Sequence, residues 1–128
     1  DRFDLRVAVQ RPGVDDLLSP GGGEPTASVA ARVQAARARS MARIGLSNAE
    51  IPAAQLDALA PVDDAARRLL RDHLERDLLT GRGYHRIRRV ARTVADLDGD
   101  HEVVGEGHVA LALQLRVSLR ISAPWRAA

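Results

Sequence analysis

Residues 80–99 read TGRGYHRIRRVARTVADLDG and carry the clearest helical pattern in the chain. At about 100° per residue, the apolar side chains share one face: Tyr84, Ile87, Val90, Ala91, Val94 and Leu97. The arginines lie on the opposite arc: Arg82, Arg86, Arg88, Arg89 and Arg92. Thr80 is a suitable N-cap, and Gly99 is a suitable stop after about Leu97. The stretch therefore predicts an amphipathic helix.

Three segments upstream of this stretch also favour helices. Residues 27–44 have a narrow apolar stripe, and Gly45 is well placed to end a helix there. Residues 46–61 are less regular and favour a short helix bounded by prolines. Residues 63–79 begin with paired aspartates, either of which suits an N-cap. Together these segments predict a mainly α fold.

The segments near the two ends of the chain are less helical. Residues 4–10 alternate apolar and polar side chains, which predicts a short half-buried strand that needs a partner strand. Residues 11–25 hold three prolines and a run of three glycines, which is typical of a linker. Residues 109–121 have an aliphatic side chain at every second position, as in a strand, but the alanines between them favour a helix. Periodicity leaves this last segment open.

Composition excludes several classes of function. The chain has 128 residues and a formal net charge of +2, and all 19 basic residues are arginine. Without lysine it has neither a P-loop lysine nor a Schiff-base amine, and without cysteine it has no disulfide, thiol nucleophile or Cys-ligated zinc. No apolar run reaches the roughly 18 residues of a membrane span, and the first residues do not resemble a signal peptide. We interpret the chain as a piece of a larger protein.

The histidines and serines show no familiar catalytic or metal-binding spacing. No two of the four histidines, His73, His85, His101 and His108, are four residues apart as in a helical metal site. His73 lies on an apolar face and is expected to be a packed, hydrogen-bonded residue, and His108 near a helix start is expected to be structural. We therefore predict no metal site and no active site complete within this chain.

The arginines between residues 82 and 92 have three interpretations. The first is a solvated helix face, and the second is a phosphate-backbone footprint for nucleic acid, although no aromatic residues alternate with the arginines to stack on bases. The third is a single arginine that binds a nucleotide phosphate from the helix N-terminus. Arg82 directly follows Thr80 and Gly81, where backbone N–H groups also face outward. Spacing alone does not decide between the three.

The same stretch carries a family resemblance. Residues 82–99 closely resemble the C-terminal signature of Mg-chelatase-like AAA+ ATPases, in the branch of the bacterial competence-associated helicases. Residues 106–116 resemble the closing helix of that family, and residues 1–5 resemble the entry to the last strand of its ATPase core. The resemblance implies an AAA+ C-terminal helical lid bundle preceded by that strand. The implied units are 1–11 as the end of the core, 12–25 as linker, 26–116 as lid and 117–128 as a tail of uncertain structure.

The resemblance also implies roles for three arginines. Arg2 corresponds to the arginine finger, the catalytic residue that reaches the γ-phosphate of ATP on the neighbouring subunit. Arg82 corresponds to the sensor-2 arginine, which contacts the nucleotide of its own subunit, and Arg89 is the reserve candidate. Arg86, Arg88, Arg89 and Arg92 are expected to be mainly surface residues. Fixed guanidinium groups suit this task because phosphoryl transfer spreads negative charge over the phosphate oxygens.

The leading hypothesis is a lid module of an oligomeric, cytoplasmic ATPase that acts on DNA. ATP and Mg²⁺ are the implied cofactors of the full-length parent, and further copies in a hexameric ring are the implied partners, with no membrane. This chain lacks the Walker motifs and should be inactive alone. The alternatives are a small helical domain that binds nucleic acid and the lid of a metal-chelatase motor subunit. On the resemblance we expect a helix up to about Arg116.

Overall fold

The computed structural model describes residues 3–19 and 21–117 as a helical chain. The α-helices are α1 (Val14–Leu18), α2 (Thr26–Ile44), α3 (Leu56–Leu59), α4 (Asp64–Glu75), α5 (Gly81–Asp98) and α6 (Glu106–Val117). Two short 3-10 turns, η1 (Asn48–Glu50) and η2 (Ala53–Gln55), lie between α2 and α3. The mainly α expectation is confirmed, and no strand is formed within the residues described.

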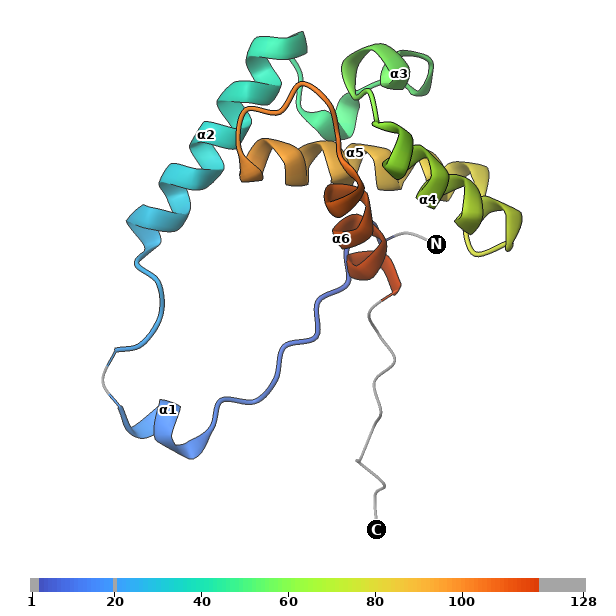
Figure 1. The fold of residues 1–128 in the computed structure, drawn as a ribbon. Coiled ribbons are helices and arrows are strands. Elements are labelled where there is room, and N and C mark those ends of the chain that lie inside the picture. Colours follow the sequence, from blue (N-terminus) through green and yellow to red (C-terminus); the bar gives the residue numbers. More distant parts are fainter. Residues whose placement is uncertain (1–2, 20, 118–128) are drawn as a thin grey trace.

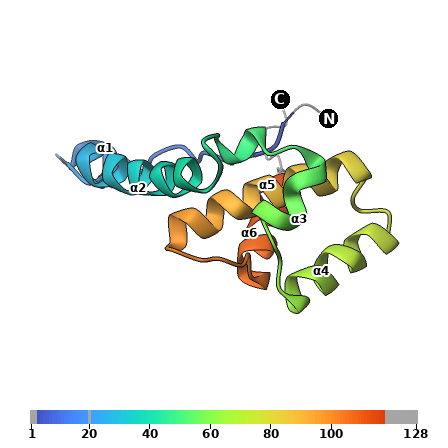
Figure 2. The same ribbon diagram turned by 90° about the horizontal axis from the view of Figure 1, so that it is seen from above.

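Helix α5 lies at the centre of the bundle that it forms with α2, α3, α4 and α6, whereas α1 lies away from the bundle (Figures 1 and 2). It contacts α6 most extensively, and it also contacts α2, α3, α4 and η1. Helix α2 reaches the bundle only with its C-terminal half, and its N-terminal half extends away toward α1 (Figure 1). A helix with neighbours on several sides cannot expose one entire face to water. Some arginines of α5 therefore lie against other segments of the chain.

Local sequence begins α4 and α5 and ends α2 where the sequence predicted. Thr80 Oγ1 accepts a hydrogen bond from Gly83 N at 3.1 Å and caps α5. Asp63 Oδ1 accepts from Ala66 N at 2.7 Å and caps α4. Gly45 takes the left-handed conformation, with φ of 68°, and ends α2.

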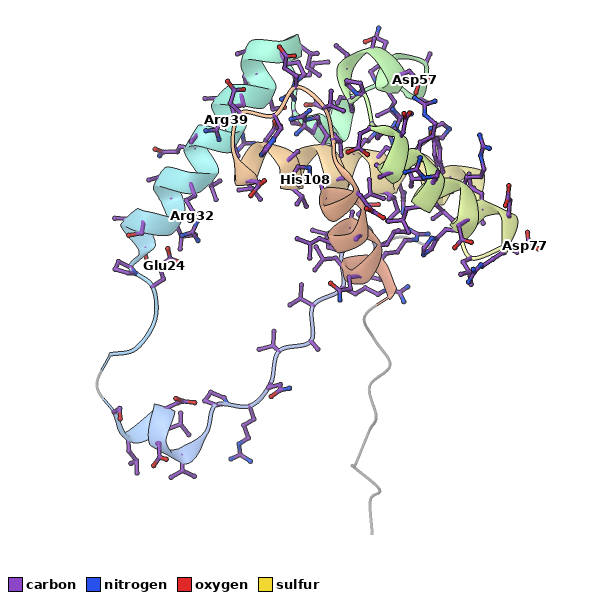
Figure 3. All side chains as sticks on the ribbon, viewed as in Figure 1. Glu24, Arg32, Arg39, Asp57, Asp77 and His108 are labelled. Atoms are coloured by element: carbon purple, nitrogen blue, oxygen red, sulfur yellow. The ribbon has the colours of Figure 1, made fainter. Side chains whose placement is uncertain are left out.

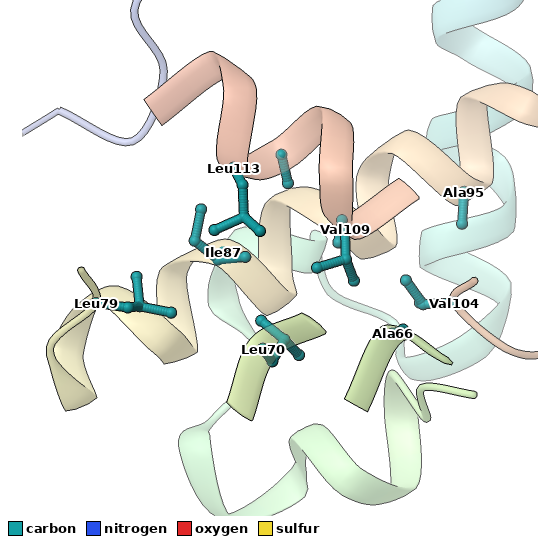
Figure 4. Close-up of a cluster of buried hydrophobic side chains, with 10 residues drawn as sticks. Ala66, Leu70, Leu79, Ile87, Ala95, Val104, Val109 and Leu113 are labelled. Carbon is teal, nitrogen blue, oxygen red and sulfur yellow. The ribbon is translucent and has the colours of Figure 1, made fainter. Parts of the chain in front are cut away.

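The apolar core lies between α4, α5 and α6 (Figure 4). Its fully buried members are small or branched: Ala66, Leu70, Leu79, Ile87, Ala91, Ala95, Val104, Val109, Ala112 and Leu113. A second, smaller cluster under α3 consists of Ile51, Leu56 and Ala60. Burying one Leu, Ile or Val side chain contributes about 1.5–3 kcal/mol, so these few contacts hold the helices together without a large aromatic core.

The core explains where α4 ends and why residues 109–117 are helical. Helix α4 ends at Glu75 rather than near Leu79, because Asp77 adopts a left-handed φ of 55° and the chain turns so that Leu79 enters the core. The ambiguous segment is a helix to Val117, since Val109, Ala112 and Leu113 follow helical spacing into the core. Tertiary packing therefore favours the helix over the two-residue alternation.

The strand predicted over residues 4–10 is not formed. The segment is extended: Arg6 N donates to Leu115 O at 2.8 Å, and the following residues are exposed and run away from the bundle toward α1 (Figure 1). No neighbouring strand among the described residues completes a ladder, which is why the alternation alone does not make a strand. The expected linker over residues 11–25 contains the short helix α1 but otherwise lacks regular structure in its described part. No helix in the described residues is long and apolar enough to cross a membrane.

Candidate functional site

Arg82 is held at the first turn of α5, directly after the capping residue Thr80. Its side chain is exposed, and the structure gives it no hydrogen-bond or ion-pair partner among the residues described. The first N–H groups of a helix lack intrahelical acceptors and carry the positive end of its dipole. The position therefore combines a free guanidinium with a site that favours an anion.

Glycine at position 83 lets a second arginine approach this turn. A Cβ atom at Gly83 would lie 3.0 Å from Leu79 Cδ1 and 3.1 Å from Arg116 Nη2. Arg116, in the last turn of α6, thus packs its guanidinium against the turn that carries Arg82. No motif in the sequence assigned a role to Arg116, and the signal for its approach was Gly83, two residues after Gly81.

Arg88 is not a surface residue, contrary to the expectation. Its side chain is 3% exposed, and it donates to the carbonyl oxygens of Leu56 at 2.9 Å and Ala60 at 2.8 Å. It also forms an ion pair of 2.6 Å with Asp57, whose pKa is lowered first by this hydrogen bond and then by the arginine charge. Arg88 therefore fastens α3 to α5.

Arg89, the reserve candidate, is also tied to the fold. Its Nε donates to Ile51 O at 2.8 Å, so its side chain lies against the segment that links η1 to η2. It lines an open groove with Val90, Thr93 and Leu97 along α5. Part of its hydrogen-bonding capacity is thus already used within the chain.

Arg92 is also not a surface residue, contrary to the expectation, because its side chain is fully buried. It donates to Asp96 Oδ1 at 2.9 Å and to the carbonyl oxygens of His101 at 2.6 Å and Glu102 at 3.2 Å. Burial lowers the pKa of the Arg92 guanidinium, and the charge of Asp96 opposes that shift. Asp96 is also fully buried, so the two residues form an ion pair inside the protein.

Side chains from α2 and η1 complete this polar network around Asp96. Arg43 pairs with both carboxylate oxygens, and Asn48 Nδ2 donates to Oδ2 at 2.7 Å. Arg39, labelled in Figure 3, donates to the backbone oxygen of Asp96 at 2.7 Å. Burial alone would raise the pKa of Asp96, but hydrogen bonds from Arg43 and Asn48 and the arginine charges outweigh it and lower the pKa.

Two further arginines bear on the predicted site. Arg86 forms a 3.2 Å ion pair with Asp4, so the N-terminal segment lies beside the middle of α5. Arg2, the predicted arginine finger, lies outside the described residues. The structure thus brings Arg116 close to the turn of Arg82 and engages Arg88, Arg89 and Arg92 elsewhere.

His73 and His108 are expected to have structural rather than catalytic roles. His73 is partly buried, and its Nδ1 lies 2.9 Å from Leu69 O, as expected of a packed, hydrogen-bonded residue. His108 in the first turn of α6 accepts a hydrogen bond from Gly105 N at 3.1 Å and so helps to begin that helix. Neither histidine is adjacent to Arg82 in the sequence, and the hydrogen bonds described for them join other residues.

Comparison with known proteins identifies the family of the helical bundle that surrounds α5. The sequence profile of the family described as "Magnesium chelatase, subunit ChlI C-terminal" matches residues 23–116, which span α2 to α6. The chain belongs to this magnesium-chelatase family. Its helical bundle is accordingly the C-terminal domain of a Mg-chelatase-like AAA+ protein, and the expected helical lid is confirmed.

Relatives of this Mg-chelatase C-terminal domain occur in several bacteria. The chain is 34% identical over 122 residues to "Competence protein ComM" of Haemophilus influenzae and 30% identical over 124 residues to "Uncharacterized protein YifB" of Escherichia coli. It is 38% identical over 120 residues to an uncharacterised protein of Mycobacterium tuberculosis. These alignments cover 91–94% of the chain but only 24% of each relative. No solved structure gave a significant match.

Proposed function

We propose that this domain supplies a nucleotide-contacting arginine, Arg82, to a Mg-chelatase-like AAA+ ATPase. One observation carries the proposal: of the five arginines of α5, Arg82 is the one exposed and without a partner among the described residues. Arg86, Arg88, Arg89 and Arg92 bond to other parts of the chain. A guanidinium held on a helix but left unbonded is suited to a ligand that arrives from outside.

The residues around Arg82 fit a phosphate group. Its guanidinium can form forked hydrogen bonds to two phosphate oxygens, and the N-terminus of α5 adds a favourable dipole. The Arg116 guanidinium, which packs against the same turn from α6, adds positive charge. ATP would supply the transferable phosphoryl group, with Mg²⁺ to neutralise its charge. The role of Arg82 would be to bind and orient the phosphate oxygens, as expected of the sensor-2 arginine.

Mutation of Arg82 in the full-length parent tests this role. We expect Arg82→Ala to lower kcat for ATP hydrolysis by about a hundredfold, because one preorganised cationic donor to the phosphate is lost. Arg71→Ala is a matched control, since Arg71 is an exposed arginine on α4. Near-normal turnover of Arg82→Ala, or an equal loss in both variants, would contradict the proposal.

We further propose that Arg2 acts as the arginine finger and that the parent assembles as a ring, most simply a hexamer. The resemblance of residues 1–5 supports this assignment. Arg2→Ala subunits should bind ATP without hydrolysing it. Mixing them with subunits that lack the Walker lysine should restore activity at those interfaces that pair an intact finger with an intact nucleotide site. Failure to restore any activity would argue against an arginine that acts across the interface.

For the parent we propose a DNA-associated role, supported by the identity to a protein named as a competence protein. Single-stranded DNA should then stimulate ATP hydrolysis by the full-length protein. The alternative of an independent nucleic-acid domain relied on the arginine face of α5, and burial of Arg88 and Arg92 removes two of its five cations. Stimulation by a porphyrin with partner subunits, and not by DNA, would favour the metal-chelatase alternative.

A further inference from the structure

Three side chains that are separate in sequence meet where α5 ends and α6 begins. Asp98 is the last residue of α5, His101 lies in the following loop, and His108 lies in the first turn of α6. His101 Nε2 is 2.8 Å and His108 Nε2 is 3.0 Å from Asp98 Oδ2. One ligand atom from each residue lies within 4.8 Å of the others. His108 is labelled in Figure 3 beside α5.

The chemistry of this cluster fits a transition metal. Two imidazole nitrogens and one carboxylate oxygen are ligands that Zn²⁺ and similar ions bind well, whereas Mg²⁺ prefers oxygen atoms. Tetrahedral Zn²⁺ places neighbouring ligand atoms about 3.3–3.5 Å apart. The two carboxylate–imidazole distances need to open only slightly, as a metal ion replaces the shared protons. Partial exposure of Asp98 and His101 leaves room for water as a fourth ligand.

The backbone around the cluster is fixed independently of any metal. The buried Arg92 guanidinium holds the carbonyl oxygen of His101 at 2.6 Å, which positions the loop that carries this ligand. Asp98 is carried by α5, and His108 is carried by α6. Ligands on such a fixed frame lose little conformational freedom when they bind an ion.

We propose that Asp98, His101 and His108 form a binding site for one divalent transition-metal ion of the Zn²⁺ type. The bound ion joins the C-terminus of α5 to the N-terminus of α6. The site is separate from the proposed contact of Arg82 with nucleotide and from its Mg²⁺, so either proposal can fail without the other. The metal site could not be recognised from the sequence, because the spacings of its three ligands match no helical metal motif.

One hydrogen bond sets the expected strength of the site. Gly105 N donates to His108 Nδ1, so the neutral ring carries its proton on Nε2 in this structure. Metal binding at Nε2 moves that proton to Nδ1, and Gly105 N–H must then bond to water instead. A lost neutral hydrogen bond corresponds to about a tenfold weaker affinity. We therefore expect weaker binding than at a comparable site whose histidine makes no such hydrogen bond.

The test uses the 128-residue chain without a histidine tag. Calorimetric titration with Zn²⁺ should show one bound ion per chain, and Co²⁺ should give a visible absorption spectrum typical of mixed nitrogen and oxygen ligation. A saturating excess of Zn²⁺ should raise Tm by several degrees, because the ion binds the folded chain. No Zn²⁺ binding by the unmodified chain would overturn the proposal, and so would Mg²⁺ binding without Zn²⁺ binding.

Variants at the two more exposed ligands separate a metal site from a hydrogen-bond network. His101→Ala and Asp98→Asn should each weaken Zn²⁺ binding at least tenfold. Asp100→Asn and His73→Gln are matched controls that should leave the affinity unchanged. If His101→Ala binds Zn²⁺ as tightly as the unmodified chain, the proposal is wrong. A variant that lowers Tm equally with and without Zn²⁺ indicates a purely structural cluster.

Discussion

The two ends of α5 use the same side chain in opposite ways. Toward the C-terminus, Arg92 is fully buried and bonds to Asp96 and to two loop carbonyl groups. At the N-terminus, Arg82 is exposed and has no partner among the residues described. Both arginines belong to one arc in the sequence pattern. The difference shows that residue type and helical phase do not determine whether an arginine is structural or free to bind a ligand.

Neighbouring segments account for the difference. Near Arg92 and Asp96, α2 supplies the guanidinium groups of Arg39 and Arg43, η1 supplies the Asn48 amide, and the loop after α5 supplies carbonyl oxygens. A buried charge is tolerated only when such partners surround it. Near Arg82, Leu79 after α4 and Arg116 at the end of α6 approach the turn among the described residues, and the Arg82 side chain is exposed.

The largest effect is expected from breaking the buried end. Asp96→Ala removes the carboxylate that accepts from Arg43, Arg92 and Asn48, and it leaves a buried arginine charge uncompensated. We expect the free energy of unfolding to fall by about 3–5 kcal/mol. Urea denaturation measures this change. Asp100→Ala, at an exposed aspartate nearby, should change stability by less than about 0.5 kcal/mol.

A smaller effect on stability is expected when the same substitution is made at the buried Arg88 and at the exposed Arg82. Arg88→Met keeps much of the side-chain volume but removes the guanidinium that donates to Leu56 O and Ala60 O, and of these two oxygens Leu56 O still accepts from Ala60 N. The expected loss is about 1–3 kcal/mol, the cost of unsatisfied buried groups. Arg82→Met should change stability by less than about 0.5 kcal/mol. Equal changes in thermal unfolding would mean that the two arginines do not differ as described.

The smallest effect concerns acid pH. The pKa of Asp96 is lowered in the folded chain, whereas an unfolded aspartate titrates near about 3.9. Its ionised form therefore contributes stability that is complete above about pH 4 and is lost as pH falls through the lower folded value. We expect the stability difference between the unmodified chain and Asp96→Asn to shrink below about pH 4. A difference that stays constant under acid would contradict this assignment.

Sequence reasoning predicted local structure well. Thr80 and Asp63 cap helices as their side chains allow, and Gly45 ends α2 because it accepts a left-handed conformation. Capping depends on atoms within a few residues, which is why it can be predicted from short patterns. The predicted strand over residues 4–10 failed because a ladder needs a second strand, and the described residues supply none. The domain boundaries and the roles of Arg2 and Arg82 remain predictions.

By itself the sequence determined that α2, α4 and α5 form, where each of them begins, where α2 and α5 end, and to which family the domain belongs. It also excluded a P-loop, because no lysine is present. Only the tertiary structure decided which arginines are buried and that Asp98, His101 and His108 meet. The helix over residues 109–117 was expected from the family resemblance and is confirmed, although the periodicity alone left it open. Helical phase specifies the direction of a side chain, but burial depends on which distant segment packs there. That choice is made by long-range contacts that no local pattern contains.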